Sequence, residues 1–490
     1  VLVLEARGGR PRTVARFSAS TAPVTALAVL PGGRALVVGD ARGRLLLYSR
    51  VKAPDGAAHW SLLRTLAGHQ AAIVALAAAP AHRLVASADA EGGLRLHHST
   101  SGRSSRLLAG PAAATHLDFS PDARLLRVDT AAGTQRYAVR APHPEATFET
   151  LFLPVRYEGH RSPEFLWQSG GTPDSEAKLS VVPLLLGTLK GALAALFFAF
   201  PLGVFAALYS ATFLEPRARR WIRPLVDLLA SIPSVLLGLV AALWLAPWLE
   251  DRLLWVLTGL VTLPVTLLAG AVAWHLLPRR LRVRVGAWGR LTWVAALLLL
   301  GLRLARLLGG ATESLLFGGD FPRWLDTELG VATMQHNAWV VGLALGVCVL
   351  PFLFAFAEEA FLAVPDPLRA AALACGASRW QVAARVVLPA ALPGLLSALL
   401  LAFARAAGET LIVLLASGNA PLVDPNPFAS LRTLAANLVI EVPEAPVGGT
   451  LYRVLFLTAL LLFALSFLLN TAALLLRRRV VSRLGGLGRA

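Results

Sequence analysis

Long apolar runs separated by short polar loops make up the chain from about Leu179 onward. An α-helix needs roughly 20 residues to cross a hydrocarbon core of about 30 Å, and most of these runs are long enough. They predict seven membrane spans, at residues 181–213, 226–247, 253–276, 291–309, 338–357, 393–418 and 450–476. The run 291–309 fits least well, because Arg303 and Arg306 interrupt one end of it.

Residues 1–140 follow another pattern, with short alternating segments of the kind that form β-strands. Three stretches align with one another, at residues 24–49, 73–99 and 114–139. Each predicts a strand, a proline, a second strand ending at an aspartate, a glycine turn and a third strand. The marker residues are Pro31, Asp40 and Gly43, then Pro80, Asp89 and Gly93, then Pro121, Asp129 and Gly133.

The repeat spacings of 49 and 41 residues, with Gly68-His69 before the second unit, are similar to those of WD40 propeller blades. An irregular β-sandwich is the alternative. Three units are fewer than the four to eight blades of a closed propeller, so we expect further blades before Val1. Residues 141–178, rich in Pro, Gly and charge, predict a linker to a membrane domain at 179–480.

Composition agrees with a membrane protein, because 56% of the residues are hydrophobic and only 15% are charged. A soluble chain of this size has about 25% charged residues. The net charge of +17 does not indicate nucleic-acid binding, since the arginines cluster beside apolar runs and no basic face with interleaved aromatic residues is evident. The lysines, Lys52, Lys178 and Lys190, lie outside any phosphate-binding GxxxxGK[ST] motif, and the histidines lack metal-ligand spacing. We therefore expect no cofactor and no metal.

Loop charges predict the orientation. Loops 214–224 and 277–290 and the tail after 476 are rich in arginine, whereas loops 310–337 and 419–449 are mainly acidic. Arginine-rich loops stay in the cytoplasm. We therefore expect loop 363–391 and the C-terminus to be cytoplasmic, and the N-terminal β-domain to be extracytoplasmic.

Segment 358–391 joins two apolar runs and predicts a short cytoplasmic helix. Asp366 is expected to cap its start, Pro367 to occupy its first position and Gly376 to end it. The segment resembles the EAA loop of ABC-transporter permeases, whose helix docks on the ATPase subunit. The residues at the family's spacing are Ala371, Ala372, Gly376, Val386, Leu388 and Pro389. Ala370 stands where the family has glutamate, and an ordinary amphipathic connector is the alternative.

Flanking segments resemble the permease subunit of phosphate-uptake ABC transporters, PstC type, in its large variety with an additional extra-membranous domain. They are residues 187–210, 232–239, 335–346, 403–413 and 426–437. The resemblance implies a mainly α-helical type I importer permease in the bacterial inner membrane, with spans 253–309 as an insertion. It also implies an ABC ATPase dimer, a sister permease subunit and an extracytoplasmic phosphate-binding protein as partners, and inorganic phosphate as substrate. ATP hydrolysis would belong to the partner ATPase, so this chain would not be an enzyme.

Arg405 and Glu409 lie within an apolar run, where charged side chains are costly and are candidates for function. A spacing of four predicts one helix face and an ion pair, and one interpretation is a structural pair that only locks helix packing. The alternative role is in the substrate path, and the resemblance supports it through the sequence R-A-x-G-E-T. Arginine binds oxyanions bidentately, and a carboxylate can accept the O–H that phosphate keeps at neutral pH and sulfate lacks.

Two other functions stay open. One is an ABC importer for a different substrate, such as another oxyanion. The other is a membrane-tethered propeller that senses or scaffolds.

Overall fold

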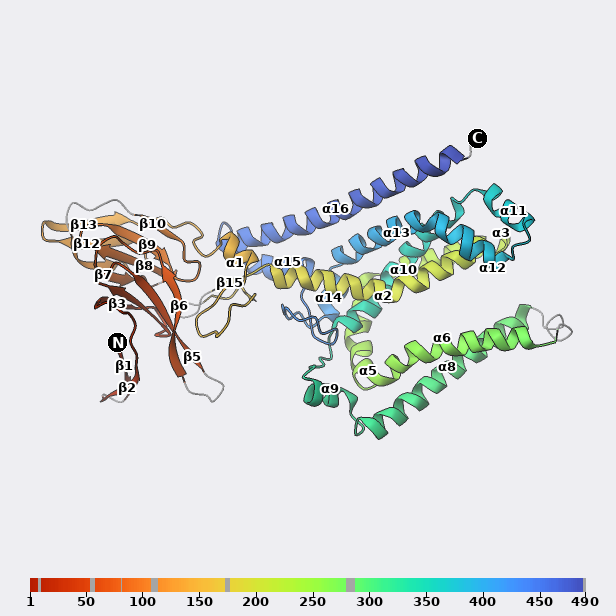
Figure 1. Cartoon of the computed structure of the whole chain (residues 1–490), viewed down its shortest axis with the longest axis horizontal. Coiled ribbons are helices and arrows are strands. Elements are labelled where there is room, and N and C mark those ends of the chain that lie inside the picture. Colours follow the sequence, from red (N-terminus) through yellow and green to blue (C-terminus); the bar gives the residue numbers. More distant parts are fainter. Residues whose placement is uncertain are drawn as a thin grey trace. The chain divides into compact units, whose positions relative to one another are not determined.

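The computed structural model describes residues 1–7, 10–52, 58–80, 82–106, 113–171, 177–278 and 287–487. The chain forms two compact units. The first consists of Val1–Pro183 with Ile440–Thr458, and the second of Leu184–Val439 with Ala459–Ala490. Strands belong to the first unit and long helices to the second (Figure 1). Arg279, Arg280, Arg282 and Arg284 of the arginine-rich loop 277–290 lie outside the described residues.

Antiparallel sheets follow one another along the first unit. The order of strands in each sheet is the order in the chain. The first sheet is β3 (Val24–Val29), β4 (Ala35–Asp40), β5 (Leu45–Lys52) and β6 (Ala58–Leu66). The second is β7 (Ile73–Ala78), β8 (Leu84–Asp89), β9 (Leu94–His98) and β10 (Ser104–Arg106), and the third is β11 (Ala114–Phe119), β12 (Leu125–Thr130) and β13 (Gly133–Ala138). A hairpin of β1 (Leu2–Arg7) and β2 (Arg10–Arg16) precedes them.

These elements confirm the predicted all-β region and the strand order of its three repeats. The first strands of neighbouring sheets, β3, β7 and β11, pack against one another, as in the blades of a propeller. Gly39 allows the first two sheets to approach closely, because a side chain there would meet Ile73 Cγ2 at 2.6 Å. Ile73 and Val85 are fully buried between these sheets, so alternating apolar residues form a continuous core.

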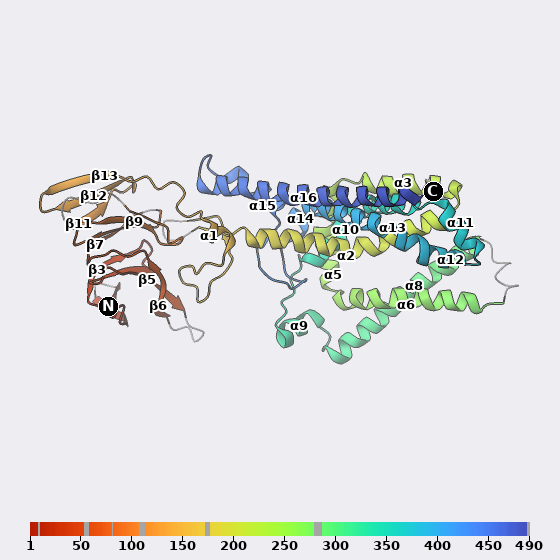
Figure 2. The same ribbon diagram turned by 45° about the horizontal axis from the view of Figure 1, so that its top comes forward.

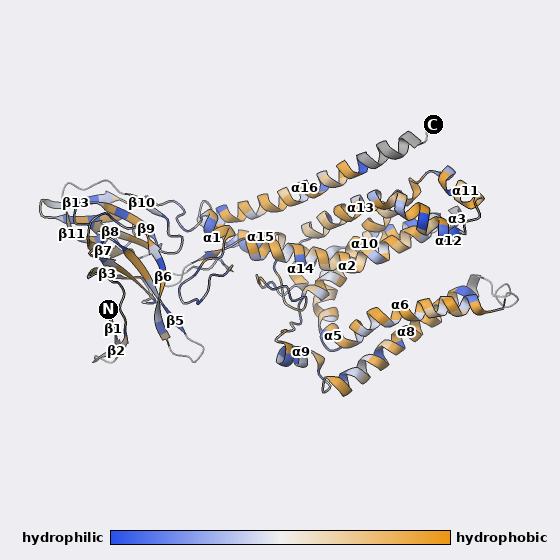
Figure 3. Ribbon diagram, viewed as in Figure 1, coloured by the Kyte–Doolittle hydropathy of each residue, from blue (hydrophilic) through white to orange (hydrophobic). Residues whose placement is uncertain are grey.

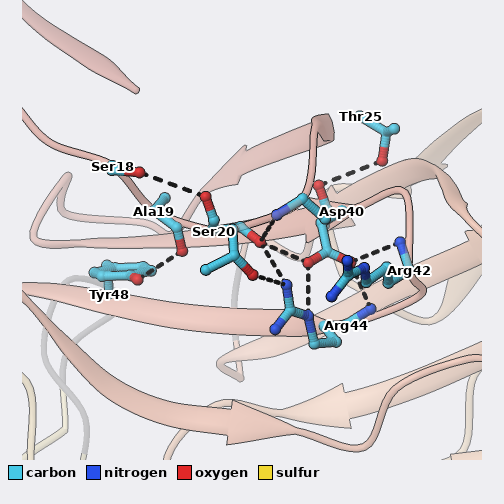
Figure 4. Close-up of polar contacts among 11 residues, drawn as sticks. Ser18, Ala19, Ser20, Thr25, Asp40, Arg42, Arg44 and Tyr48 are labelled. Carbon is cyan, nitrogen blue, oxygen red and sulfur yellow. Dashed lines mark hydrogen bonds and ion pairs between the residues drawn. The ribbon is translucent and has the colours of Figure 1, made fainter.

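The aspartates that end β4 and β8 organise the turns that follow these strands. Asp40 Oδ1 accepts hydrogen bonds from the backbone N–H groups of Arg42 and Arg44, and Asp40 Oδ2 accepts one from Ser20 Oγ (Figure 4). Burial raises the pKa of Asp40, but the hydrogen bonds from Ser20 and from the Arg44 and Arg42 backbone outweigh it, so the pKa lies below its usual value. Asp89 makes the same turn contacts, to the backbone of Glu91 and Gly93.

A buried polar chain crosses the second sheet. His69 Nδ1 lies 2.8 Å from Asp89 Oδ2, and His69 Nε2 lies 2.7 Å from Ser87 Oγ. Ser87 Oγ lies 2.8 Å from His97 Nε2. These side-chain hydrogen bonds connect the loop that contains Gly68-His69 to the second and third strands of the sheet.

The rest of the first unit packs around the start of the last helix. Residues 141–178, expected to be a linker, contain α1 (Phe148–Phe152), β14 (Trp167–Gln168) and the buried Tyr157, and they end at β15 (Lys178–Leu179). The indole of Trp167 donates a hydrogen bond to Glu441 Oε1, 3.3 Å away. His143 Nδ1 lies 2.8 Å from Thr450 Oγ1. The described residues of this segment, 141–171 and 177–178, are therefore part of the β-rich unit rather than a separate linker.

The second unit is built from long apolar helices (Figure 3). Among the described residues, six helices are long and apolar enough to cross a membrane, and a bent helix pair is a seventh candidate. The long helices are α2 (Val182–Thr212), α6 (Leu253–Leu276), α8 (Ala287–Leu316), α10 (Ala338–Leu362), α13 (Leu388–Gly408) and α16 (Thr450–Leu487). Short helices α9 (Phe321–Leu329) and α15 (Leu434–Glu441) lie in the connecting segments. The predicted polytopic helical fold is thus confirmed.

Two predicted spans are interrupted. Span 226–247 consists of α3 (Pro216–Ala230) and of α4 (Ser234–Val240), which continues through a π-helical turn into α5 (Ala246–Glu250). The pair is bent by 73° at Ser231–Pro233, where proline cannot donate a helical hydrogen bond. Span 393–418 is likewise interrupted: α13 ends at Gly408, and the short α14 (Leu411–Ala416) follows. Hydropathy alone does not reveal either break, since apolar residues continue across both.

Small residues bring α2 and α10 together at the centre of the unit. A side chain at Gly342 would meet the Ala194 backbone at 2.9 Å, and one at Gly346 would meet Ala195 O at 3.1 Å. In lipid, where water does not drive helices together, such close contact is a main source of helix association. α10 is accordingly the most enclosed of the candidate spans, with 61% of its apolar window buried.

We predict that acid destabilises the second sheet. Burial lowers the pKa of His97 to about 3, with the nearby His69 and Arg95 adding to the effect, and burial lowers the pKa of His98 to about 4. These values lie below the unfolded value of about 6.5, so the stabilisation is complete above pH 6.5 and is lost as the pH falls toward the folded pKa values. Each histidine then costs about 1.4 kcal/mol per pH unit.

Hydrogen exchange of the whole chain, measured between pH 7 and 5, will test this. Protection of β7, β8 and β9 should fall with acidification, and His97→Gln should remove about one proton from the pH dependence. The exposed His59 supplies the control, since His59→Gln should not change how the stability of the sheet depends on pH. A pH dependence of stability that His97→Gln leaves unaffected would contradict the prediction.

Candidate substrate path and coupling loop

The end of α10 carries a buried carboxylate beside the candidate coupling loop. Glu358 is 4% exposed, and it accepts a hydrogen bond of 2.5 Å from Ser210 Oγ of α2. The Arg219 guanidinium of α3 lies 3.5 Å from Glu358 Oε1 and donates a 2.7 Å hydrogen bond to Ser210 O. Three helices therefore meet at one compensated charge.

The neighbouring Glu359 points to the surface and makes an ion pair with Arg477 of α16. The sequence predicts a span at 338–357, and α10 continues beyond it to Leu362. The two adjacent glutamates thus bind different elements.

The predicted loop helix is present as α11 (Asp366–Ala374). Its expected cap is wrong by one residue. Pro365 is the N-cap, with a φ of −59° and a ψ of 134°, and Asp366 lies inside the first turn without capping it. There its carboxylate still faces the positive end of the helix dipole.

Gly376 ends the helix as predicted. Its φ is +84°, a left-handed conformation that glycine adopts without strain. The Gly376 N–H donates to Leu373 O, and the Ala377 N–H donates to Ala372 O. These two bonds form a Schellman motif, which satisfies the last carbonyl groups of the helix.

The loop has an anchored side and a free side. Ala372, Val386 and Leu388 are half-buried and pack on a core that includes Phe361 and Val382. The free side is exposed and partly apolar, with Ala370, Ala371, Leu368, Leu373, Trp380 and Pro389 on the surface. After α12 (Arg379–Val382) and a π-helical turn, the chain passes directly into α13. The segment that contains α11 and α12 is therefore directly connected to α13, the helix that carries Arg405.

Arg405 and Glu409 do not form the predicted helical ion pair. α13 ends at Gly408, and Glu409 is extended, with a ψ of 130°. A spacing of four therefore no longer places the two side chains on one helix face. Among the described residues, no ion pair within 4.0 Å joins them.

Both side chains nevertheless lie next to the same part of α10. The Arg405 guanidinium carbon is 5.5 Å from the centre of the Phe352 ring, and both Arg405 and Glu409 lie near the Cys348 thiol. Arg405 is exposed and Glu409 is half-buried on this side of the unit. The guanidinium therefore contacts α10 at Phe352 and Cys348, while the side chain as a whole stays exposed.

A second helix supports the break after Gly408. α14 packs on α4, and a side chain at Gly238 would meet Ile412 Cα at 3.1 Å. The two interrupted spans thus support one another. Irregular backbone at membrane depth is tolerated only where protein or water satisfies it.

Polar residues at the other end of the helices have structural roles. Asn337 caps α10 by accepting from the N–H groups of Trp339 and Val340, as expected for a residue at this position. Lys190 donates to the carbonyls of Asp424 and Ala429 and so fixes the loop after α14. Within the described residues, no group of His, Cys, Asp and Glu side chains is arranged to hold a metal ion.

Sequence reasoning missed the Ser210–Arg219–Glu358 network. Its charged members are far apart in the chain and belong to separate predicted spans and loops, so no local spacing indicates the contact. It also missed Cys348 and Phe352 as neighbours of Arg405, since apolar helix residues carry no signal of what they face.

Comparison with known proteins supplies the family. Residues 199–484 match the model of the binding-protein-dependent transport system inner membrane component, and residues 60–98 match that of the WD domain, G-beta repeat. The first match covers more than half of the chain. This protein therefore belongs to the family of ABC importer permeases, which are multi-pass proteins of the inner membrane.

Its relatives include several named permeases. A probable ABC transporter permease protein, YqgH, of Bacillus subtilis is 24% identical over 65% of this chain and 81% of its own length. The phosphate transport system permease protein PstC of Mesorhizobium japonicum is 26% identical over 66% of this chain and 80% of its own. The phosphate transport system permease protein PstA 1 of Mycobacterium tuberculosis is 35% identical over 31% of this chain and 50% of its own.

We predict that Glu358 stabilises the fold and that Glu359 does not. Glu358→Gln removes the charge opposite the partly buried Arg219 and should cost about 2 kcal/mol, whereas Glu359→Gln breaks an exposed pair and should cost less than about 0.5 kcal/mol. Thermal unfolding in detergent measures both. Arg219→Gln should add little to Glu358→Gln, because the two changes break one interaction. Equal effects at positions 358 and 359 would refute the network's role.

Proposed function

We propose that this chain is the permease subunit of an ATP-driven importer that moves inorganic phosphate across the inner membrane. The observation that carries the proposal is Arg405, an exposed guanidinium on a membrane helix just before the break at Gly408. Its planar donors suit an oxyanion, and its charge persists in a low-dielectric site. The likeness to PstC proteins supports phosphate as that oxyanion.

Glu409 complements Arg405 in this proposal. Phosphate at neutral pH keeps an O–H group that a carboxylate can accept, whereas sulfate offers none. Because Glu409 is not paired with Arg405 in this structure, its carboxylate oxygens are free to act as acceptors for such a donor. The two residues then select protonated phosphate by attraction and by hydrogen bonding.

Energy comes from a separate ABC ATPase dimer that docks on the exposed side of α11. The positions that transmit its motion are Asp366, Ala371, Ala372, Gly376, Val386, Leu388 and Pro389. Ala370 offers no charge to the ATPase, so docking depends on shape and apolar contact. Closure of the ATPase dimer pushes α11, and the continuous path from α12 into α13 moves Arg405 between outward and inward access.

Other subunits complete the importer. A sister permease faces the exposed side of α13, and an extracytoplasmic phosphate-binding protein delivers the anion. The arginine-rich loops favour an orientation with α11 and the C-terminus in the cytoplasm and the β-rich unit outside. The chain itself has no catalytic role in ATP hydrolysis.

Loss of Arg405 should abolish transport without loss of assembly. In proteoliposomes with the complete complex, Arg405→Gln should lower ATP-driven phosphate uptake by at least about 100-fold, a loss of roughly 2.7 kcal/mol. Arg405→Lys should keep part of the activity, since the charge remains but the fork is lost. Arg453→Gln, which removes an exposed arginine at the start of α16, is the matched control. Normal phosphate uptake by a well-expressed Arg405→Gln complex would show that Arg405 does not line the substrate path.

Glu409 is tested through selectivity. Glu409→Gln supplies an N–H donor in place of a carboxylate oxygen, so sulfate should compete about tenfold better against phosphate uptake than in the wild type. Both complexes use the same binding protein, so its own selectivity cancels in the ratio. If the wild-type complex transports sulfate or another oxyanion better than phosphate, the protein belongs to an importer of that oxyanion instead.

A further inference from the structure

α6 and α8 form a tightly joined hairpin within the second unit, side by side in both views (Figures 1 and 2). Thr262 Oγ1 donates to Gly301 O at 3.2 Å, and Thr258 Oγ1 donates to Ala305 O at 3.0 Å. A side chain at Gly301 would meet Thr266 Oγ1 at 2.6 Å. The face of α8 that contains Gly301 and Ala305 is therefore fixed against α6.

Arg303 lies between these two contact residues and at the middle of the span Gly289–Leu316. About 20 Å of helix extends on either side of it, at a rise of 1.5 Å per residue. Arg303 follows Gly301 by two residues, which is a rotation of about 200° around the helix axis. Arg303 is therefore on the face of α8 opposite α6. It is exposed, and within the described part of the chain it has no ion pair, hydrogen bond or ring contact.

The next arginine on the helix, Arg306, is also exposed, but it has a contact within the hairpin. The Arg306 guanidinium carbon lies 5.3 Å from the centre of the Trp255 ring of α6. A cation over an aromatic face is stabilised where water is excluded. The contrast singles out Arg303 as the charge for which the hairpin provides no partner.

Lipid is a poor environment for this side chain. Charged residues in membrane helices almost always face a protein interior or a water-filled cavity and pair there. Helical side chains lean toward the N-terminal end of the helix, so Arg303 leans along the longer stretch of α8 rather than toward its nearer end. Apolar residues surround it on the exposed face, with Leu299 64% and Leu307 67% exposed.

We propose that this face of α8 binds a transmembrane helix of another subunit, one that carries an aspartate or glutamate near its middle. The charge complementarity requires an acid at the depth of Arg303. Ala296, two turns before Arg303 and exposed, would let the partner helix approach closely. A second copy of this chain does not fit, because the same face would oppose arginine to arginine and the sequence of α6 contains no acid.

The experiment uses the complete importer complex in native membranes, with a photoreactive residue at position 299. Cross-linking should join α8 to a helix with a central Asp or Glu in another subunit, identified by mass spectrometry. Arg303→Leu should lower the yield of this adduct by about tenfold or more, since it leaves the partner's acid unpaired, whereas Arg303→Lys should retain it. Arg306→Leu removes an equal charge one turn away and should change the yield less than about twofold.

Charge exchange provides the decisive arm. Arg303→Glu should abolish the adduct, and replacing the partner's acid by arginine in the same complex should restore it. The proposal is overturned if position 299 labels only lipid, a helix without an acid, or a second copy of this chain. It is also overturned if the cross-linking yield is unchanged in Arg303→Leu, because the contact would then not depend on the charge of Arg303.

Discussion

The absence of water in the hydrocarbon layer is the constraint on which the second unit depends. Backbone groups there must form hydrogen bonds within the protein, and charged side chains must be paired or face a water-filled path. Glu358 has a partner, because Arg219 and Ser210 surround it. Arg306 and Arg405 each lie over an aromatic ring, and both are otherwise exposed. Arg303 is exposed and has no partner among the described residues, and we infer that it requires a contact from outside this chain.

The same constraint explains where the helices are interrupted. The break after Gly408 is backed by α14 packed on α4, and the bend at Ser231–Pro233 precedes that same α4. Each interruption costs helical hydrogen bonds, so it is stable only beside protein that shields or satisfies the backbone. The helix that follows each interruption packs on the other, because α4 contacts α14, and α14 begins two residues after Glu409. A proposed substrate path benefits from this, because backbone and side-chain groups there are not committed to a helix.

The sequence predicted the elements well wherever a local rule governs them. Hydropathy identified the apolar helices, a period of two gave the strands, and glycine chemistry correctly placed the end of α11 at Gly376. It failed where tertiary contacts override a local rule. The spacing of Arg405 and Glu409 predicts an ion pair only in an unbroken helix, and the apolar residues after Thr410 hide the break. The partner of Glu358 is set by the packing of α3 on α10, which no spacing records.

Burial within the chain also separates its centre from the surfaces that need other molecules. The apolar window of α10 is 61% buried, whereas those of α8 and α16 are 11% and 6% buried. An apolar surface needs only lipid, so low burial alone does not imply a subunit. A charge on such a surface changes the conclusion, since lipid leaves it unpaired at a cost of about 2.5–3.5 kcal/mol on insertion scales. The substrate path that we propose at Arg405, on the exposed side of α13, is therefore more consistent with a path shared with a sister subunit than with one inside a single chain. An opening between two chains can also close without breaking the core of either, which is what alternating access requires.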